Sequence, residues 1–269
     1  MERQAPELSG VPETMLWSLY HRAVESGRAD RVLQDPESVR IMAALDYDFA
    51  GHFGRPGGSL AARAASIDTA LRGWLDRHPD GLVVSLGEGL ETQSRRVDNG
   101  RMRWLSVDLP EAIRLRECFL PPTDRFRHLA MSALDPAWMD AVDNTRPVFV
   151  VAQGLLMYLE PGEVAGLFGR MAAKLPGAWL VFDTIPPWLS RLTLRGLHQT
   201  PRYRLPRMPW GIARDDIERT LRRWCPGLGP VELLPYDMPR GAPAVLGRFM
   251  AAMPFLRDQL PSLVRTRFG

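Results

Sequence analysis

The chain has 269 residues, 45% of them hydrophobic, and a formal net charge of +3 at pH 7. This length and apolar content allow one sizeable core within a single decorated α/β domain. Cys118 and Cys225 lie far apart and the five histidines show no ligand spacing, so neither a disulfide framework nor a metal site is predicted. Residues 1–7 lack an apolar segment, and the longest apolar stretch, 148–159, is too short to span a bilayer. We therefore expect a soluble, cytoplasmic protein without a membrane partner.

Charge is unevenly distributed along the chain. Residues 186–269 contain fourteen arginines and six acidic residues, a net charge of +8, which leaves −5 for the remainder. A basic C-terminal part can attract an anionic substrate, a membrane surface or nucleic acid. Its arginines can equally be solvated on helix faces, and both interpretations stay open at this point.

Helices are predicted for most of the first 78 residues. Apolar residues recur at intervals of three and four over 12–25, 36–45 and 59–77, which is the spacing of amphipathic helices. A glycine-rich segment, 51–58, is predicted to be a flexible connector. We expect residues 1–78 to form an N-terminal helical cap.

Strands and helices alternate from residue 79 onward. Short apolar or β-branched runs predict strands of a sheet that is covered on both faces. The alternation argues for a parallel sheet with right-handed crossovers. The predicted strands are 82–86, 103–107, 126–130, 148–153 and 178–184, and the predicted helices are 91–97, 110–119, 136–142 and 163–175.

The pattern loosens beyond residue 184. The segment 186–212 is rich in proline, arginine and tryptophan, which predicts a lid rather than a core element. Residues 79–269 are thus expected to form one Rossmann-like domain that carries this lid. The remaining predicted elements are a helix over 215–224, strands over 231–236 and 263–268, and an apolar helix over 244–253.

Residues 83–93 carry the clearest functional signal. An apolar run breaks at Gly87 and Gly89, and a second run ends at Asp108 about twenty residues later, as in nucleoside-binding α/β sites. The glycines allow a sharp turn and a close backbone approach to a ligand, while Asp108 can accept hydrogen bonds from two ribose hydroxyls. A dinucleotide loop needs a third small residue where Thr92 stands. The pattern therefore favours a ligand with ribose but no pyrophosphate, such as S-adenosylmethionine.

Four segments, taken in order, point to a family. They are 10–14 (G-V-P-E-T), 86–92 (L-G-E-G-L-E-T), 107–111 (V-D-L-P-E) and 153–159 (Q-G-L-L-M-Y-L). Together they resemble the leucine carboxyl methyltransferase family, in particular its bacterial polyketide-type O-methyltransferase branch, the tetracenomycin methyltransferase group. The resemblance implies a class I methyltransferase fold of the α/β class. Its Rossmann-like sheet would be mostly parallel with an antiparallel last strand, an N-terminal helical extension, and a lid after strand 5.

The same resemblance implies S-adenosylmethionine as the cofactor and suggests which residues bind it. Arg63 would reach from the N-terminal helices to the carboxylate of the cofactor's methionine part, unless it is a surface arginine of an amphipathic helix. Gly87 and Gly89 would lie under the methionyl and ribose parts. Asp108 would bind the ribose, and its alternative role is to cap the helix that Pro110 opens.

Two positions depart from the family pattern. Family members commonly have an acidic residue before the leucine that follows the third strand, where it accepts from the adenine amino group. Here Ala133 precedes Leu134, so Ser132, Asp135 or a backbone carbonyl would take over that contact. Gln153 stands where glutamate is usual, and its amide can still orient the cofactor without adding negative charge.

Two glutamates of the glycine loop have more than one possible role. Glu88 and Glu91 either bind the cationic cofactor or are solvated at the start of the following helix, where carboxylates are favourable. The family commonly has aspartate in place of Glu91, so the loop shape can be kept while the reach of the side chain differs.

The acceptor decides what catalysis requires. A sulfonium methyl group is already activated, so the protein must mainly exclude water and align the nucleophile. A carboxylate acceptor needs no base, whereas a phenol needs a group that takes its proton. His198 in the lid is the catalytic candidate for that role, with a structural role as the alternative.

Aromatic and basic residues alternate in the predicted lid. This composition predicts a pocket for a small flat aromatic or acidic acceptor. It could also bind single-stranded nucleic acid, which we rank lower because the basic segment is short and no RNA-recognition motif is present. The aromatic residues are Trp188, Tyr203 and Trp210, and the basic ones are Arg191, Arg195, Arg202, Arg204 and Arg207.

These patterns predict an S-adenosylmethionine-dependent O-methyltransferase that acts on a hydroxyl or carboxylate of a small molecule in secondary metabolism. Two alternatives remain from the sequence alone. One is a nicotinamide-dependent Rossmann oxidoreductase, and the other is a catalytically silent protein that binds the cofactor. The sequence does not indicate an oligomeric state.

Overall fold

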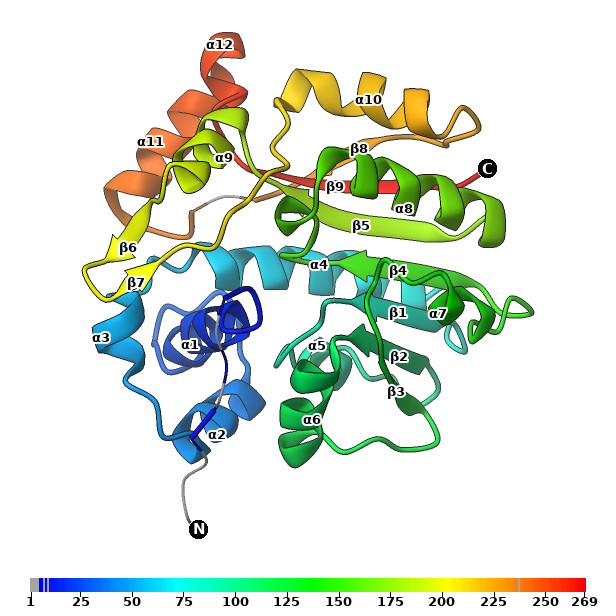
Figure 1. Cartoon of the computed structure of the whole chain (residues 1–269), viewed down its shortest axis with the longest axis horizontal. Coiled ribbons are helices and arrows are strands. Elements are labelled where there is room, and N and C mark those ends of the chain that lie inside the picture. The colour runs from blue at the N-terminus through cyan, green and yellow to red at the C-terminus, as the bar shows by residue number, and fades with distance from the viewer. Residues whose placement is uncertain (1–4, 7, 9, 237) are drawn as a thin grey trace.

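The computed structural model describes residues 5, 6, 8, 10–236 and 238–269, and its architecture is α/β (Figure 1). A seven-stranded sheet has the order β3-β2-β1-β4-β5-β9-β8. The first five strands pair in parallel, and β9 pairs antiparallel with both β5 and β8. The predicted, mostly parallel sheet with an antiparallel last strand is confirmed. The strands are β1 Leu82–Leu86, β2 Arg103–Asp108, β3 Phe126–Ala130, β4 Val148–Ala152, β5 Trp179–Thr184, β8 Glu232–Leu234 and β9 Ser262–Arg267, and a separate hairpin consists of β6 His198–Thr200 and β7 Tyr203–Arg204.

Helices precede the sheet and connect its strands. In the described part of the chain, none of them is both long and apolar enough to cross a bilayer. The helices are α1 Thr14–Ser26, α2 Pro36–Ala44, α3 Phe49–Phe53, α4 Ser59–Leu75, α5 Gln93–Arg96, α6 Pro110–Phe119, α7 Ala137–Asp140, α8 Pro161–Lys174, α9 Pro187–Leu194, α10 Ile217–Trp224, α11 Gly241–Ala252 and α12 Pro254–Arg257, with 3-10 turns η1 Leu156–Tyr158 and η2 Arg214–Asp216.

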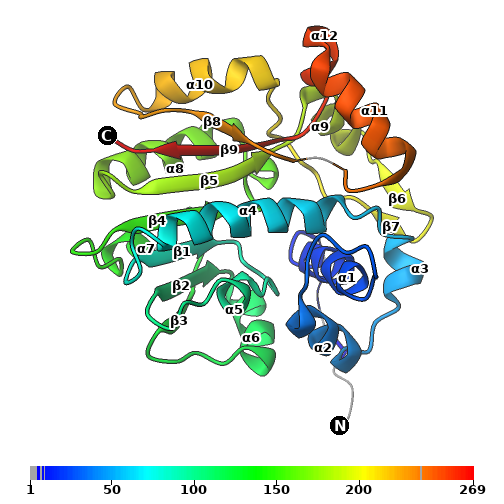
Figure 2. The ribbon, with the colours of Figure 1, turned by 180° about the vertical axis from the view of Figure 1, so that it is seen from behind.

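The two faces of the sheet support two separate cores. Because successive side chains of a strand point to opposite faces, Val83 and Trp104 lie on one face, where Trp74 of α4 packs against them. Val84 lies on the other face, in the core that includes Phe168 of α8. Figure 2 shows α4 lying across the sheet in the view from behind. Both faces are therefore covered, as the uninterrupted apolar runs of the strands predict.

The N-terminal helices divide between two places. Helices α1, α2 and α3 share a core that includes Leu16 of α1 and Ile41 of α2 and extends to Leu115 of α6 and Tyr203 of β7. Helix α4 instead packs on the sheet, so a boundary at residue 78 does not separate a cap from the sheet core. Residues 1–4, 7 and 9 of the predicted cap lie outside the described residues.

The glycine-rich connector predicted over 51–58 is partly helical. Helix α3 occupies its first three positions, because Asp48 accepts a hydrogen bond from the Gly51 backbone N–H at 3.0 Å and caps the turn. Phe49 and Phe53 are buried and hold the turn against α1 and α2. The connector prediction is therefore wrong at its N-terminal end, where two buried phenylalanines outweigh the glycines.

The segment 186–212 consists of α9, the β6–β7 hairpin and an extended return. The hairpin packs on α3: the Tyr203 ring meets the Phe53 ring edge to face at 4.7 Å, and Thr200 Oγ1 donates to the His52 carbonyl at 2.6 Å. Trp210, which the sequence analysis assigned to a ligand pocket, lies instead in the sheet core. The end of this segment is thus a core element rather than a lid.

Phe168 tests the packing of the α8 core. Its fully buried ring contacts Phe182, Trp224 and Phe268. We expect Phe168→Ala to lower the free energy of unfolding by about 3–5 kcal/mol because it leaves a cavity. Val245→Ala, at a side chain that is 63% exposed, should change it by less than about 0.5 kcal/mol. Urea denaturation measures both, and equal losses would contradict the assigned core.

Candidate functional site

A cavity of about 420 Å³ lies at the edge where the parallel strands end. In open α/β sheets, ligands bind in the crevice outside the carboxyl ends of the strands. Four strands contribute to the wall here: Gly87 follows β1, Asp108 ends β2, Gln153 follows β4 and Asp183 lies near the end of β5. Arg63 of α4 closes the cavity from the helical side. The sheet order therefore brings together the sequence-predicted residues that were far apart in the chain.

The glycine loop has the tight geometry that its sequence predicts. Gly87 and Gly89 have φ angles of 61° and 52°, a region that side chains disfavour. A Cβ on Gly87 would lie 2.8 Å from Leu155 Cδ1, and a Cβ on Gly89 would lie 2.6 Å from Met15 Cβ. Both positions thus require glycine, so that the backbone itself forms the cavity wall.

Asp108 holds the loop and also faces the cavity. Its Oδ2 accepts from the Gly89 backbone N–H at 2.6 Å, and its Oδ1 accepts from Leu109 N–H at 2.7 Å. No side chain caps α6, so the alternative role as a helix cap is wrong. Burial raises the pKa of the Asp108 carboxyl above its ordinary value. Among the described residues it has no ion-pair partner, and its second lone pairs remain available to a ligand.

Arg63 forms a buried ion pair with Asp183, a residue that the sequence analysis missed. Arg63 Nη1 donates to Asp183 Oδ2 at 2.6 Å, and the Gly154 N–H donates to Oδ1 at 2.6 Å. Burial alone would lower the pKa of Arg63, but Asp183 raises it above the ordinary value. The Arg63 Nε remains buried without a partner. Asp183 could have been found, because it stands at the end of a predicted strand just as Asp108 does.

Gln153 links the cavity to the glycine loop. Its Nε2 donates to Glu91 Oε2 at 2.9 Å, and its Oε1 is buried without a partner. Both residues line the cavity. The amide therefore places an unsatisfied acceptor next to a carboxylate, which suits a ligand that carries an ammonium group.

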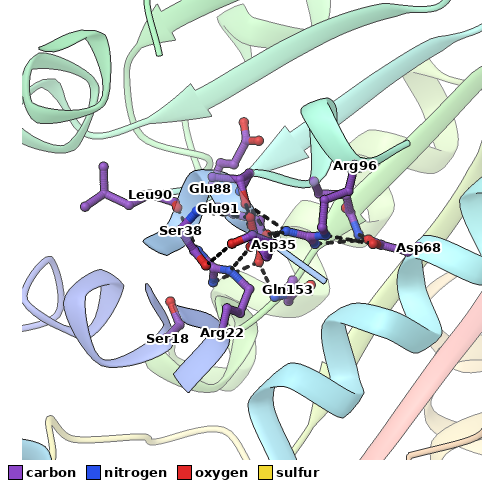
Figure 3. A network of polar contacts seen from close by, with 12 residues as sticks. Ser18, Arg22, Asp35, Ser38, Asp68, Glu88, Leu90, Glu91, Arg96 and Gln153 are labelled. Atoms are coloured by element: carbon purple, nitrogen blue, oxygen red, sulfur yellow. Dashed lines mark hydrogen bonds and ion pairs between the residues drawn. The ribbon is translucent and has the colours of Figure 1, made fainter. Parts of the chain in front are cut away.

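Glu91 belongs to a buried ionic network (Figure 3). It pairs with Arg22 at 3.0 Å and with Arg96 at 2.7 Å, and each of these arginines also binds Asp35. Arg96 further binds Asp68 at 2.7 Å. Burial raises the pKa of Glu91, but the two guanidinium groups outweigh burial and hold this pKa at about 2. The network joins α1, α2 and α4 to the loop.

Glu88 has a purely structural environment. Its carboxylate accepts from Trp104 Nε1 at 3.1 Å and from Arg116 Nη2 at 2.9 Å. Arg116 Nη1 also donates to the carbonyls of Gly89 and Glu91. Neither of the two loop glutamates is therefore solvated at a helix start, which was one of their two predicted roles.

The loop after β3 brings two of its candidate residues to the cavity. Ser132 and Leu134 line it, whereas Asp135 does not and instead accepts from the Ala137 N–H at 2.9 Å. Ser132 Oγ accepts from the Leu134 N–H at 3.1 Å. Of the three substitutes predicted for the missing acidic residue, Asp135 is thus ruled out by its position.

The predicted catalytic histidine and the lid arginines do not reach the cavity. His198 is an exposed residue of β6, and all five arginines of the predicted acceptor pocket are exposed as well. None of these six residues is among those that line the cavity. The reason is the alternation of the segment, since Tyr203, Leu205 and Met208 turn inward and the arginines between them turn outward. The prediction of an arginine-lined pocket is wrong.

The part of the cavity beyond Gln153 is apolar. Met157, Ile185 and Met208 form a small buried core there. Its polar groups include the hydroxyls of Tyr158 and Tyr236, and burial raises the pKa of each to about 12. Both phenols therefore keep their protons near neutral pH and can donate hydrogen bonds.

Similarity to known proteins agrees with this geometry. A model of the leucine carboxyl methyltransferase family matches residues 15–172, more than half of the chain. The tetracenomycin polyketide synthesis O-methyltransferase TcmP of Streptomyces glaucescens is 31% identical over 224 residues, which cover 82% of this chain and 81% of that protein. The S-adenosyl-L-methionine-dependent methyltransferase dpfgK of Gibberella zeae is 28% identical over 183 residues, 61% of each chain.

A solved structure shows the same fold. The crystal structure of the CurJ carbon methyltransferase is similar to 96% of this chain and 67% of its own, with a TM-score of 0.55 and 12% sequence identity. At that identity the likeness concerns the fold alone. The family model and the relative at 31% identity decide the assignment: the chain belongs to the leucine carboxyl methyltransferase family and is an S-adenosylmethionine-dependent methyltransferase.

Proposed function

We propose that the protein methylates an oxygen atom of a small, largely apolar molecule of the polyketide type. The observation that carries this proposal is the division of one cavity into a polar half and an apolar half. Asp108, Gln153 and Arg63 line the polar half, and Met157 and Ile185 lie in the apolar half. The name of the relative from Streptomyces glaucescens, a polyketide O-methyltransferase, supports the same acceptor class.

The residues of the polar half fit S-adenosylmethionine. Four residues that line the cavity have a buried side-chain polar atom without a partner: Gln153 Oε1, Arg63 Nε, Gln93 Oε1 and Trp17 Nε1. The first can accept from an ammonium group, and the second can donate to a carboxylate, which are the two charged groups of the cofactor's methionine part. At Gly87 and Gly89 the bare backbone forms the cavity wall, because a Cβ at either position would overlap Leu155 or Met15. The predicted roles of these residues remain proposals that their positions support.

Asp108 would bind the ribose hydroxyls with the lone pairs that the loop amides leave free. The ribose would then lie against Gly89, whose N–H already bonds to the same carboxylate. Ser132 Oγ and the backbone beside Leu134 are the acceptors offered to the adenine, since both residues line the cavity. In this proposal the adenosyl part lies over β2 and β1 and the methionyl part over β4, which the order of these residues along the sheet edge supports.

Charge in the polar half favours a cationic ligand. Each of three cavity carboxylates has a guanidinium partner: Glu88 has Arg116, Glu91 has Arg22 and Arg96, and Asp183 has Arg63. Asp108 is the carboxylate without one. A ligand with a net positive charge therefore relieves the field of these buried acids.

Catalysis would depend mainly on position. The bound cofactor supplies an activated methyl group on a sulfonium. The apolar wall excludes water, and the protonated hydroxyls of Tyr158 and Tyr236 can donate to the acceptor oxygen and orient it. Asp183 lines the cavity and can accept a hydrogen bond from a hydroxyl acceptor, whereas His198 is exposed and does not line it. An ionised carboxylate acceptor would need only the two donors.

The ribose assignment is tested by binding of S-adenosylhomocysteine. We expect Asp108→Ala to weaken binding about tenfold or more, because a buried charged hydrogen-bond acceptor is lost. Asp108→Asn keeps one oxygen acceptor, so its affinity should lie between those of the wild type and Asp108→Ala. Isothermal titration calorimetry measures the binding constants, and Asp124→Ala, at an exposed site, is the matched control. Unchanged affinity in Asp108→Ala would refute the assignment.

Glu91 should make stability depend on acid pH. Its folded-state pKa of about 2 lies below the ordinary value of about 4.3, so its contribution is present above about pH 4.3 and is lost as the pH falls toward 2. We expect Glu91→Gln to cost roughly 3 kcal/mol of unfolding free energy at pH 7. In urea titrations, the difference in unfolding free energy between Glu91→Gln and the wild type should become smaller at pH 4 and pH 3. A gap that does not change with pH, as expected for exposed Asp124→Asn, would argue against the ionised network.

Methyl transfer itself tests the proposed activity. Labelled S-adenosylmethionine is incubated with the protein and a panel of polycyclic aromatics that carry phenol or carboxyl groups. We expect labelled product from at least one compound, and strongly reduced product with Asp108→Ala at low cofactor concentration. Alkaline treatment releases the label from a methyl ester but not from a methyl ether, which identifies the accepting oxygen. Cofactor binding without transfer to any compound would favour the catalytically silent alternative.

A further inference from the structure

A second cavity of about 480 Å³ lies next to the one described above. We name the first the transfer cavity and the second the distal cavity. Tyr236 and Pro261 line both of them, so these two residues form a shared wall. Ala251 of α11 and Leu233 of β8 line the distal cavity only. The proposed function uses none of the residues that belong to the distal cavity alone.

The strand order places the two cavities in one line. Strand β9 starts at the edge where β5 ends, because Ser262 pairs with Thr184. Strand β8 ends at this same edge, since Leu234 pairs with Leu263. Residues just outside these ends therefore continue the row formed by the ends of β2, β1, β4 and β5. Along this edge, the distal cavity follows the transfer cavity on the side away from the adenosyl site.

The lining of the distal cavity is mostly apolar, and its one charged residue is Arg214. Leu233, Ala251 and Leu260 contribute carbon surface. Arg214 is half-buried. Its backbone carbonyl accepts from Ile217 N–H, but its guanidinium group has no hydrogen-bond or ion-pair partner among the described residues. An apolar wall next to an unpaired guanidinium is a complementary surface for an anionic group on an apolar molecule.

The acidic residues beside Arg214 do not neutralise it. Asp215 pairs with Arg257 at 2.7 Å, and Asp216 pairs with Arg219. Both carboxylates are thus occupied by other arginines, although they neighbour Arg214 in sequence. Among the described residues, then, no carboxylate forms an ion pair with Arg214.

We propose that the distal cavity binds the far end of the methyl acceptor, and that the acceptor is an elongated apolar molecule whose far end carries a carboxylate. Arg214 binds that carboxylate, and the accepting oxygen lies in the transfer cavity. Tyr236 stands between the two ends and contacts the middle of the molecule. The inference rests on the proposed function, because it assigns one ligand to both cavities. It also explains how an acceptor can be acidic although the lid arginines point to solvent.

A fluorescent fatty-acid analogue tests this proposal directly. The probe is 11-(dansylamino)undecanoic acid, and its neutral methyl ester is the matched ligand without charge. We expect Arg214→Gln to weaken the binding of the acid about tenfold and to leave the binding of the ester unchanged, because only the acid loses a charged hydrogen bond. Arg223→Gln, at an exposed arginine of α10 outside both cavities, should alter neither.

Filling each cavity in turn tests whether one ligand occupies both. Ala251 lines the distal cavity and Leu189 lines the transfer cavity. Ala251→Phe and Leu189→Trp narrow these cavities, so each should weaken the binding of both the acid and the ester. Ala252→Phe, at an exposed neighbour, is the control for the first change. Thermal unfolding of each variant shows that it is folded. The Arg214→Gln result stands by itself if a filled variant does not fold.

Three results would overturn the inference. Equal binding of the acid to wild type and Arg214→Gln would refute the charge assignment. Unchanged binding in Ala251→Phe would place the probe elsewhere, and unchanged binding in Leu189→Trp would show that no single ligand spans both cavities. Calorimetry with S-adenosylhomocysteine is run on the same samples. If the wild type does not bind S-adenosylhomocysteine, the proposed function is refuted. If it binds S-adenosylhomocysteine normally and these variants do not change the binding of the probe, only the inference is refuted.

Discussion

The buried ionic network around Glu91 is the constraint on which the site depends. Arg22 and Arg96 reach Glu91 from α1 and α5, and both also bind Asp35 before α2. These contacts fix the glycine loop against helices that precede the sheet in sequence. A buried ion pair that loses one partner is strongly destabilising, because it leaves an uncompensated charge. The loop is therefore rigid before a ligand arrives, and little ordering remains for binding to accomplish.

The same network explains how Gln153 can replace a glutamate. Its Nε2 donates to Glu91, so that a carboxylate still lies at this end of the cavity, displaced by one side chain. A glutamate at position 153 would instead place two carboxylates against each other without a hydrogen-bond donor between them. The amide at position 153 thus carries no charge of its own and supplies a hydrogen bond that holds the Glu91 carboxylate. Arg63 and Asp183 form another buried ion pair beside Gln153, since Asp183 also accepts from the N–H of Gly154.

The sequence predicted the sheet and the candidate cofactor residues that line one cavity, because these depend on local patterns. Apolar runs marked the strands, and Gly87 and Asp108 stand where any nucleoside-binding sheet needs a bend and an acceptor. The network was not predictable in this way, because its members come from five separate segments that have no common period. The predictions that His198 and Trp210 face the ligand were wrong for a related reason. Composition identified their segment as unusual, but only packing decides which side chains of an irregular segment turn inward.

The topology of the sheet also bears on how the molecule is assembled. Strand β9 is the last described strand in chain order, yet it lies between β5 and β8. In the described sheet β8 pairs with β9 alone, so β8 can join the sheet only after β9 has been synthesised. Folding during synthesis starts with the N-terminal parts of a chain. The five parallel strands can therefore associate earlier than the antiparallel edge that lines the distal cavity.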